Sequence, residues 1–477
     1  MIPPEPLASL SQEERLALVA ELQRQNAALQ RQVAELTASH EALHAEIEQL
    51  KRGGKRQAAP FSKGTRESAP KRPGRKPGSG TFRSREAPPP EAITEPPVDV
   101  QVTLEACPAC GGPLEEERVD VAYRTELPQR PRPQVTRYRV WICRCTVCGT
   151  QVRGQHPDLA PDQYGATAHR LGPRVMAAAH ALHYGVGIPV RKVPAVLAAL
   201  TGVQLTQGAL TQDALRRAVG VIGTAYAQLR AAVPAAPVVH TDDTGWRVGG
   251  EPADLLAFET DAATVSQIRR HHRHEEVQEV IPADYDGVMV TDRGRSDDAG
   301  AFEGVTQQKC VAHILRSVDD VLATKKGRAR DFGEQLKGLL QAALALWRTH
   351  RDSQGAEFKA EAEALQREVT YQLRDRGLRD VDNQRLLNEL GRHHDRGNLL
   401  RFLADPRIEP TNNRAERALR PAVIARKVLH CPKTGGGAHT FAAFTSVVRT
   451  LANNGIDAVV DGLYHLFRSL TVHADAL

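Results

Sequence analysis

The chain has 477 residues, of which 41% are hydrophobic, and this is enough for more than one domain with a buried core. No apolar run approaches the roughly 18 residues of a membrane-spanning helix, and the N-terminus lacks the basic and apolar regions of a secretory signal, so we expect neither. The formal net charge is +6, but residues 51–85 alone contain 12 Lys and Arg against one acid. This local excess favours binding to a polyanion.

Residues 1–50 are predicted to form a coiled-coil dimerisation helix. Leucine recurs at every seventh position, as Leu22, Leu29, Leu36, Leu43 and Leu50. With these leucines at the d positions of heptads, Val19, Val33 and Ile47 fall at a positions, a combination that favours a parallel dimer. Asn26 at a further a position would set the register. The alternative is one amphipathic helix that packs on its own domain.

Residues 51–97 lack hydrophobic periodicity and are predicted to be a basic, disordered linker. The proline-containing stretch Lys71–Gly78 includes Arg75 and Lys76. These side chains suit a short hook in the minor groove of DNA, where arginine lies between the phosphate walls. The alternative is a solvated spacer that binds any polyanion weakly.

Residues 98–155 are predicted to form a zinc ribbon. They contain two C-x-x-C pairs, made by Cys107, Cys110, Cys145 and Cys148. Four thiolates at this spacing bind one tetrahedral Zn²⁺, which we expect to be structural. Cys143 competes with Cys145 for one ligand position, and a redox dithiol is a weaker alternative. The alternating segment Thr136–Cys143 predicts a strand between the pairs.

Residues 160–235 are predicted to form a helical domain. Segments 189–200 and 206–215 have helical patterns and are separated by a turn that contains glycine. A helix-turn-helix would place the second segment in a DNA major groove. An ordinary helical hairpin is an equally good interpretation.

Residues 236–318 are predicted to form the first part of a catalytic core, with a hairpin-led mixed sheet. One apolar run leads to Asp242, within the predicted strand Val238–Val248, and another leads through Val288–Thr291 to Asp292. We therefore expect both carboxylates at strand ends, where open sheets bind ligands. Asp243 is an alternative ligand, but strand alternation directs it to the opposite face from Asp242.

Residues 319–403 are charged and have helical patterns, so they are predicted to be a helical insertion. Trp347 and Phe358 are its expected core anchors. Residues 404–477 are predicted to complete the catalytic core.

A third carboxylate, Glu416, lies in the polar, arginine-rich stretch of this C-terminal part. Two strand-end aspartates and a helix-borne glutamate suit a site that holds two divalent cations around a phosphodiester. Carboxylate oxygens are hard ligands and favour Mg²⁺ or Mn²⁺. Glu409 would replace Glu416 only if the loop before Pro410 folded inward.

At these motifs the chain resembles a DDE transposase of the insertion-sequence-66 family. The resemblance is carried by the C-x-x-C pairs, Asp242–Thr244 with Trp246, Val290–Asp292, Cys310–Arg316, Asn412–Pro421 and Arg426–Lys427. It implies a ribonuclease-H-like core, DNA strand transfer and a triad of Asp242, Asp292 and Glu416. The chain departs from the family at Asp243, where glutamate is usual, but the first aspartate is retained. Family members usually act with two small accessory proteins of the same element.

Four further side chains are predicted to contact DNA phosphate. Arg420 shares a helix face with the glutamate at i+4 spacing, and Lys427 follows it. The resemblance places His313 and Arg316 near the same site. The alternatives are plain surface charges and, for His313, a packed histidine. The run His271–His274 has no acidic neighbour at metal spacing in the sequence and is predicted to be a solvated basic turn.

Together these features predict a multidomain α+β protein with a coiled coil, a zinc ribbon, a helical domain and a ribonuclease-H-like core with a helical insertion. We expect a transposase that uses two Mg²⁺ or Mn²⁺ ions per site to cleave and join DNA. The alternatives are a nuclease without strand transfer and a catalytically dead DNA-binding regulator. Expected partners are element ends, target DNA, a second copy of the chain and accessory proteins. The expected location is the nucleoid in a bacterial cytoplasm.

Overall fold

A computed structural model shows two units, residues 1–72 and 73–477. It describes residues 133–294, 296–350, 355–374, 376–453 and 455–472, together with 106–115 and the positions 11, 13, 20, 23–27, 30, 32, 102 and 122. The predicted linker, with Arg75 and Lys76, lies outside the described residues, as does most of the predicted coiled coil.

The first described strands form a small antiparallel hairpin. β1 (Ile142–Arg144) pairs with β2 (Gln151–Arg153), with Cys143 opposite Val152. The predicted strand Thr136–Cys143 was therefore wrong in its extent, because β2 offers hydrogen-bonding partners for only three residues.

Four helices follow before the main sheet. They are α2 (Pro173–His180), α3 (Val193–Thr201), α4 (Gln207–Val219) and α5 (Val221–Ala232). α3 ends at Gly202, whose φ of 81° is the left-handed conformation that glycine adopts easily. α4 begins after Thr206, whose hydroxyl accepts a hydrogen bond from the Ala209 amide. These residues thus form a helix, a turn and a helix, and a role for them in DNA binding stays a prediction.

The central sheet has five strands in the order β5-β4-β3-β6-β7. They are β3 (Val238–Val248), β4 (Glu251–Glu259), β5 (Thr264–Arg269), β6 (Val288–Thr291) and β7 (Thr306–Lys309), and the short helix α6 (His274–Gln278) lies between β5 and β6. β3, β4 and β5 pair antiparallel, whereas β6 runs parallel to β3 and β7 parallel to β6. Gly249 and Gly250, with φ of 64° and 92°, make the tight turn between β3 and β4.

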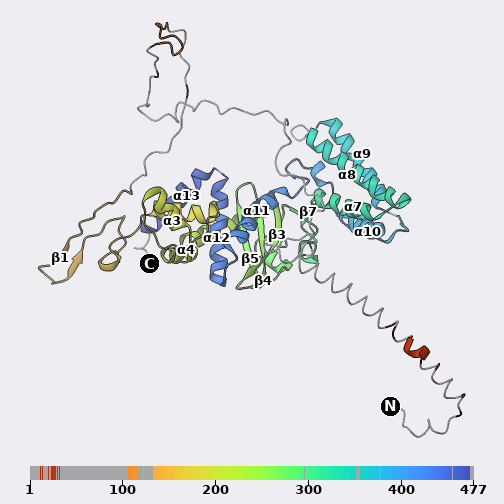
Figure 1. Ribbon diagram of the computed structural model, residues 1–477, viewed down its shortest axis with the longest axis horizontal. Helices are drawn as coiled ribbons and strands as arrows, with labels where there is room; N and C mark the ends of the chain where they lie inside the picture. Colours follow the sequence, from red (N-terminus) through yellow and green to blue (C-terminus); the bar gives the residue numbers. More distant parts are fainter. Residues whose placement is uncertain are drawn as a thin grey trace. The chain divides into compact units, whose positions relative to one another are not determined.

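Helices cover both faces of this sheet, as Figure 1 shows. On one face, α5 and α12 (Gly435–Ala452) contact β5, and α2–α4 and α13 (Ile456–Val472) extend the same core. The other face packs against α11 (Asn413–Leu429) and α7 (Val311–Thr324). Residues alternate between these two cores along the strands: Met289 joins the first, and Val288 and Val290 join the second.

The predicted insertion forms a helical layer that shares the second core. It consists of α8 (Asp331–Thr349), α9 (Ala356–Leu373) and α10 (Val381–Asp395), which pack with α7. Phe358 is almost fully buried in this core, and Trp347 packs against it while partly exposed. Among the described helices, none has the length and apolar character needed to cross a bilayer.

Candidate active site

The parallel pairing of β3 with β6 brings two aspartates side by side. Val238 lies opposite Val288 and His240 opposite Val290, so the next positions on the same face are Asp242 and Asp292. Adjacent strands are about 4.8 Å apart. Asp292 directly follows β6, but Asp242 lies inside β3, so the strand-end prediction was wrong for Asp242. The reason is that β4 pairs with β3 as far as Val248, whereas β6 pairs with β3 only as far as His240.

Both aspartates lie on the face that α11 and α7 cover. Asp242 lies on the same face of β3 as Trp246 and Val248, and these two side chains share a core cluster with Leu419 of α11. Glu416 lies in the first turn of α11 and is half exposed. The three predicted ligands therefore come from β3, the end of β6 and one covering helix.

A buried asparagine anchors the start of α11 against the other two segments. Asn412 is fully buried, and its side-chain amide donates to the carbonyl of Thr241 at 2.7 Å. Its backbone N–H donates to Sγ of Cys310 at 3.2 Å, just before α7. The backbone N–H of Cys310 in turn donates to the carbonyl of Thr291 at 2.9 Å. Asn412 was not singled out as a site residue from the sequence, although it lies in the conspicuous stretch that carries Glu416.

His313, in the first turn of α7, lies between two of the carboxylates. Its Nδ1 is 3.0 Å from Oδ1 of Asp292, and its Nε2 is 4.0 Å from Oε1 of Glu416. Contact with Asp292, and next with Cys310, raises the pKa of His313 to about 10, so the imidazole is cationic at neutral pH. This cation partly offsets the negative charge of the site.

The site still concentrates negative charge. Burial, followed by the charge of Asp292 and then those of Asp243 and Glu416, raises the pKa of Asp242 to about 8. A carboxyl group held protonated by its neighbours is one that a cation would return to the ionised form. The oxygen donors of Asp242, Asp292 and Glu416 fit Mg²⁺ or Mn²⁺.

A buried lysine supports the end of β6, and sequence reasoning missed it. Lys309 is fully buried; its Nζ is 2.5 Å from Oδ1 of Asp298 and donates to the Asp292 carbonyl oxygen at 3.3 Å. Nζ also donates to the Thr291 hydroxyl at 2.9 Å. Nothing local marked this lysine as buried, because its acidic partner reaches it only through the tertiary fold.

Asp243 faces the opposite side of the sheet from Asp242. Its carboxylate is 3.3 Å from Nε2 of His272, and an oxygen of Asp254 lies within 4.8 Å of both. The sequence shows no acidic partner at metal spacing for His271–His274, and the fold supplies two to His272, because Asp243 and Asp254 lie on β3 and β4. Asp243 thus belongs to a separate cluster from the three carboxylates.

The two cysteine pairs form matching turns. The Cys107 amide donates to the carbonyl of Gly112 at 3.0 Å, and the Cys145 amide donates to that of Thr150 at 2.8 Å. The residue after each second cysteine is a glycine with φ near 70°. Cys143 lies within β1 and has no such role, which favours Cys145 as the ligand. The zinc ion that would join the two turns stays a prediction.

The remaining predicted phosphate contacts are solvent-exposed. They are Arg316 on α7 and Arg420 and Lys427 on α11. Arg426 is instead buried and donates to the Thr244 hydroxyl at 2.9 Å and to the carbonyl of Gly245, fastening α11 to β3. Arg414 pairs with Asp261 at 2.6 Å.

Comparison with known proteins agrees with this architecture. A family model described as Transposase IS66 family matches residues 169–440, which include the sheet, the insertion and α11. This chain belongs to that family.

A curated relative is the Sinorhizobium fredii (strain NBRC 101917 / NGR234) protein described as "Uncharacterized protein y4qI". It is 28% identical to this IS66-family chain over 173 residues. The match covers 33% of this chain and 30% of that relative.

The first prediction concerns the pH dependence of stability. The pKa of Asp242 is about 8 in the fold, against about 3.9 for an unfolded aspartate. The folded state therefore binds an extra proton between these values, and the stability of the metal-free protein falls as pH rises through this window. Asp242→Asn removes that loss. We expect the melting temperature of the variant, measured by calorimetry without added Mg²⁺ or Mn²⁺, to exceed that of wild type by a margin that grows from about pH 5 to about pH 8.

Addition of Mg²⁺ provides the matched comparison. The ion should raise the melting temperature of the wild type more than that of Asp242→Asn, because the variant lacks one carboxylate ligand. If the melting temperatures of the two proteins changed in parallel with pH, Asp242 would not lie in a buried anionic site.

Proposed function

We propose that this chain is a DDE transposase that cleaves DNA at the ends of an insertion sequence and joins those ends to target DNA. The observation that carries the proposal is the convergence of Asp242, Asp292 and Glu416 on one face of the sheet. The strand order, with three antiparallel strands followed by two parallel ones, supports a ribonuclease-H-like core.

The three carboxylates would hold two Mg²⁺ or Mn²⁺ ions. Bound there, such a pair lowers the pKa of an attacking water and neutralises charge on the phosphodiester oxygens. In the cleavage step water attacks phosphorus, and the 3′-oxygen of the neighbouring nucleotide leaves as a free hydroxyl. In the joining step that hydroxyl attacks a phosphodiester of target DNA, and the target's own 3′-oxygen leaves.

The surrounding residues would keep this site in shape. Asn412 anchors the helix that carries Glu416, and Lys309 holds the chain on both sides of Asp292. His313 contacts Asp292 and adds a positive charge beside the phosphate position. The exposed Arg316, Arg420 and Lys427 are proposed to contact DNA phosphates, and the four paired cysteines to hold a structural Zn²⁺.

Two alternatives remain distinct from this proposal. A nuclease with the same core would cut DNA without joining it. A catalytically dead DNA-binding regulator would need no carboxylate set, and the retention of all three acids in one charged cluster disfavours it.

The second prediction tests the chemistry. Precleaved element ends with a free 3′-hydroxyl are incubated with the protein, its accessory proteins, Mg²⁺ and plasmid DNA, and joined products are measured on gels. We expect wild type to join the ends. Asp242→Asn, Asp292→Asn and Glu416→Gln should each reduce joining by at least about 100-fold, as loss of a ligand from a two-metal site does. Binding of the ends should change little.

Asp243→Asn is the matched control, since it removes the neighbouring carboxylate on the opposite sheet face. It should join ends at a rate close to that of wild type. Nicked but unjoined target DNA would indicate the nuclease, and loss of joining in Asp243→Asn with full activity in Asp242→Asn would reverse the assignment.

The third prediction concerns assembly. We propose that residues 1–50 pair two chains through a parallel coiled coil. Deletion of these residues should convert a dimer to a monomer in light scattering, while the melting temperature of the remaining domains stays nearly unchanged. A truncated chain that remains dimeric would refute the proposal.

A further inference from the structure

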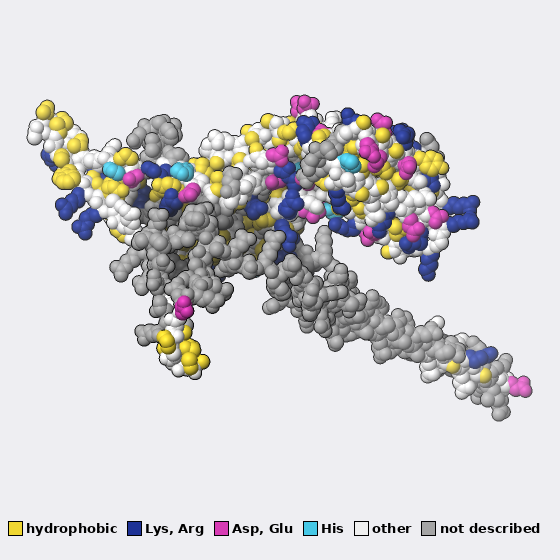
Figure 2. Space-filling model, turned by 90° about the horizontal axis from the view of Figure 1, so that it is seen from above, with side chains coloured by type: hydrophobic (Ala, Val, Ile, Leu, Met, Phe, Trp, Pro, Cys, Tyr) yellow, Lys and Arg dark blue, Asp and Glu magenta, His cyan; other side chains and the backbone are white. Residues whose placement is uncertain are grey.

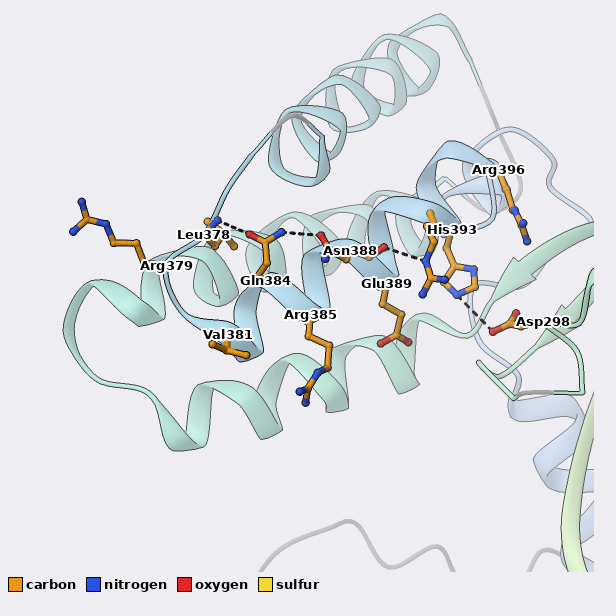
Figure 3. A pocket seen from close by; sticks show the side chains of 11 residues that line it. Asp298, Leu378, Arg379, Val381, Gln384, Arg385, Asn388, Glu389, His393 and Arg396 are labelled. Carbon is orange, nitrogen blue, oxygen red and sulfur yellow. Dashed lines mark hydrogen bonds and ion pairs between the residues drawn. The ribbon is translucent and has the colours of Figure 1, made fainter.

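A groove of about 930 Å³ runs along α10 in the helical insertion (Figure 3). Its lining residues are Asp298, Leu378, Arg379, Val381, Gln384, Arg385, Asn388, Glu389, Arg392, His393 and Arg396. The α10 members recur every three or four residues, which places them on one side of the helix. The opposite side of α10 packs into the core through Leu386, Leu387 and Leu390.

The groove contains an excess of positive charge. Four arginines line it, and all four are solvent-exposed. Its two acids are already paired with cations outside the lining: Glu389 with Arg293 at 2.6 Å and Asp298 with Lys309 at 2.5 Å. These pairs leave the acids little charge with which to offset the arginines.

The individual arginines differ in how far they are neutralised. Arg396 pairs with Glu303 at 3.0 Å, and Arg385 is 3.9 Å from Asp382. Arg379 and Arg392 form no ion pair with any residue in the described part of the chain. On the surface that Figure 2 shows, basic and acidic side chains are interspersed.

The inner end of the groove adjoins the carboxylate site. Asp298 shares the ammonium of Lys309 with the carbonyl of Asp292. Nε2 of His393 lies 3.7 Å from Asp298, as Figure 3 shows. Arg293, the residue after Asp292, reaches α10 through Glu389. A DNA strand that extended from the active site along this path would next reach the arginines.

We propose that this groove binds the sugar-phosphate backbone of DNA that extends beyond the active site. The proposal rests on the proposed function. Arg385, Arg392 and Arg396 are spread over about 17 Å of α10, given the 1.5 Å rise per helical residue, and Arg379 precedes the helix, so the arginines form a row and do not converge on one point. A row of this kind matches a polymeric anion with regularly spaced phosphates better than a small anion. Guanidinium groups bind phosphate oxygens in pairs.

Two DNA segments share this chemistry: the donor DNA that flanks the element end, and the target DNA. The fourth prediction separates them with Arg379→Ala/Arg392→Ala, which removes the two unpaired arginines. Arg379→Lys/Arg392→Lys retains the charge, and Arg348→Ala removes an exposed arginine on α8 outside the groove. Binding to labelled duplexes is titrated without added Mg²⁺ or Mn²⁺, and without a chelator that would remove the proposed structural Zn²⁺, at several salt concentrations. The duplexes are element ends with flank, element ends without flank, and unrelated target DNA.

If two phosphate contacts are lost, the slope of log K against log salt should become shallower by about 2 units for the alanine variant. The lysine variant and Arg348→Ala should keep the wild-type slope, and melting temperatures show that all variants are folded. A change seen only for ends with flank assigns the groove to donor DNA. A change seen with target DNA assigns it to the target. Unchanged slopes on all three duplexes, or equal effects of Arg348→Ala, would overturn the proposal.

The joining assay keeps the two proposals apart. Because binding is measured without added Mg²⁺ or Mn²⁺, the salt slopes test the groove even if no DNA is joined. Joining by wild type with unchanged slopes would uphold the transposase and reject the groove. Altered slopes without joining by wild type would uphold the groove and reject the transposase.

Discussion

The parallel pairing of β3 with β6 is the constraint on which the site depends. It holds Asp242 and Asp292 at corresponding positions on neighbouring strands. A shift of this register by one residue would turn one aspartate to the opposite face of the sheet. The two cores oppose such a shift, because Met289 and Val290 are both fully buried, on opposite faces. Packing of the sheet therefore also specifies the geometry of the carboxylates.

The site is stabilised from outside rather than by its own acids. Burial, and next the charge of Asp292, raises the pKa of Asp242, so a charged carboxylate is unfavourable at this position. Asn412 and Lys309, both fully buried, hold the segments that carry Glu416 and Asp292 through hydrogen bonds to backbone carbonyls. A crowded anionic site is costly to the fold, and a metal pair would recover that free energy on binding.

From the sequence, the strands that carry the two aspartates could be predicted, whereas the tertiary contacts around the site could not. Apolar runs predicted the strands before Asp242 and Asp292, because buried strands have a strong local pattern. The extent of β3 was predicted, but the position of Asp242 inside the strand rather than at its end was not, since it is set by pairing with β4. The roles of Lys309 and His272 were missed because their acidic partners, Asp298 and Asp243, lie in other segments and reach them only in the folded sheet. Tertiary neighbours of this kind leave no periodic signal.

The order of the segments along the chain has a consequence for synthesis. All five strands are complete at Lys309, yet Glu416 follows only after α7–α10. Growing chains on the ribosome would thus contain both aspartates before the glutamate, and a copy terminated before residue 416 would contain all five strands without the third acid. The three carboxylates of the proposed site are therefore present together only after translation has passed residue 416.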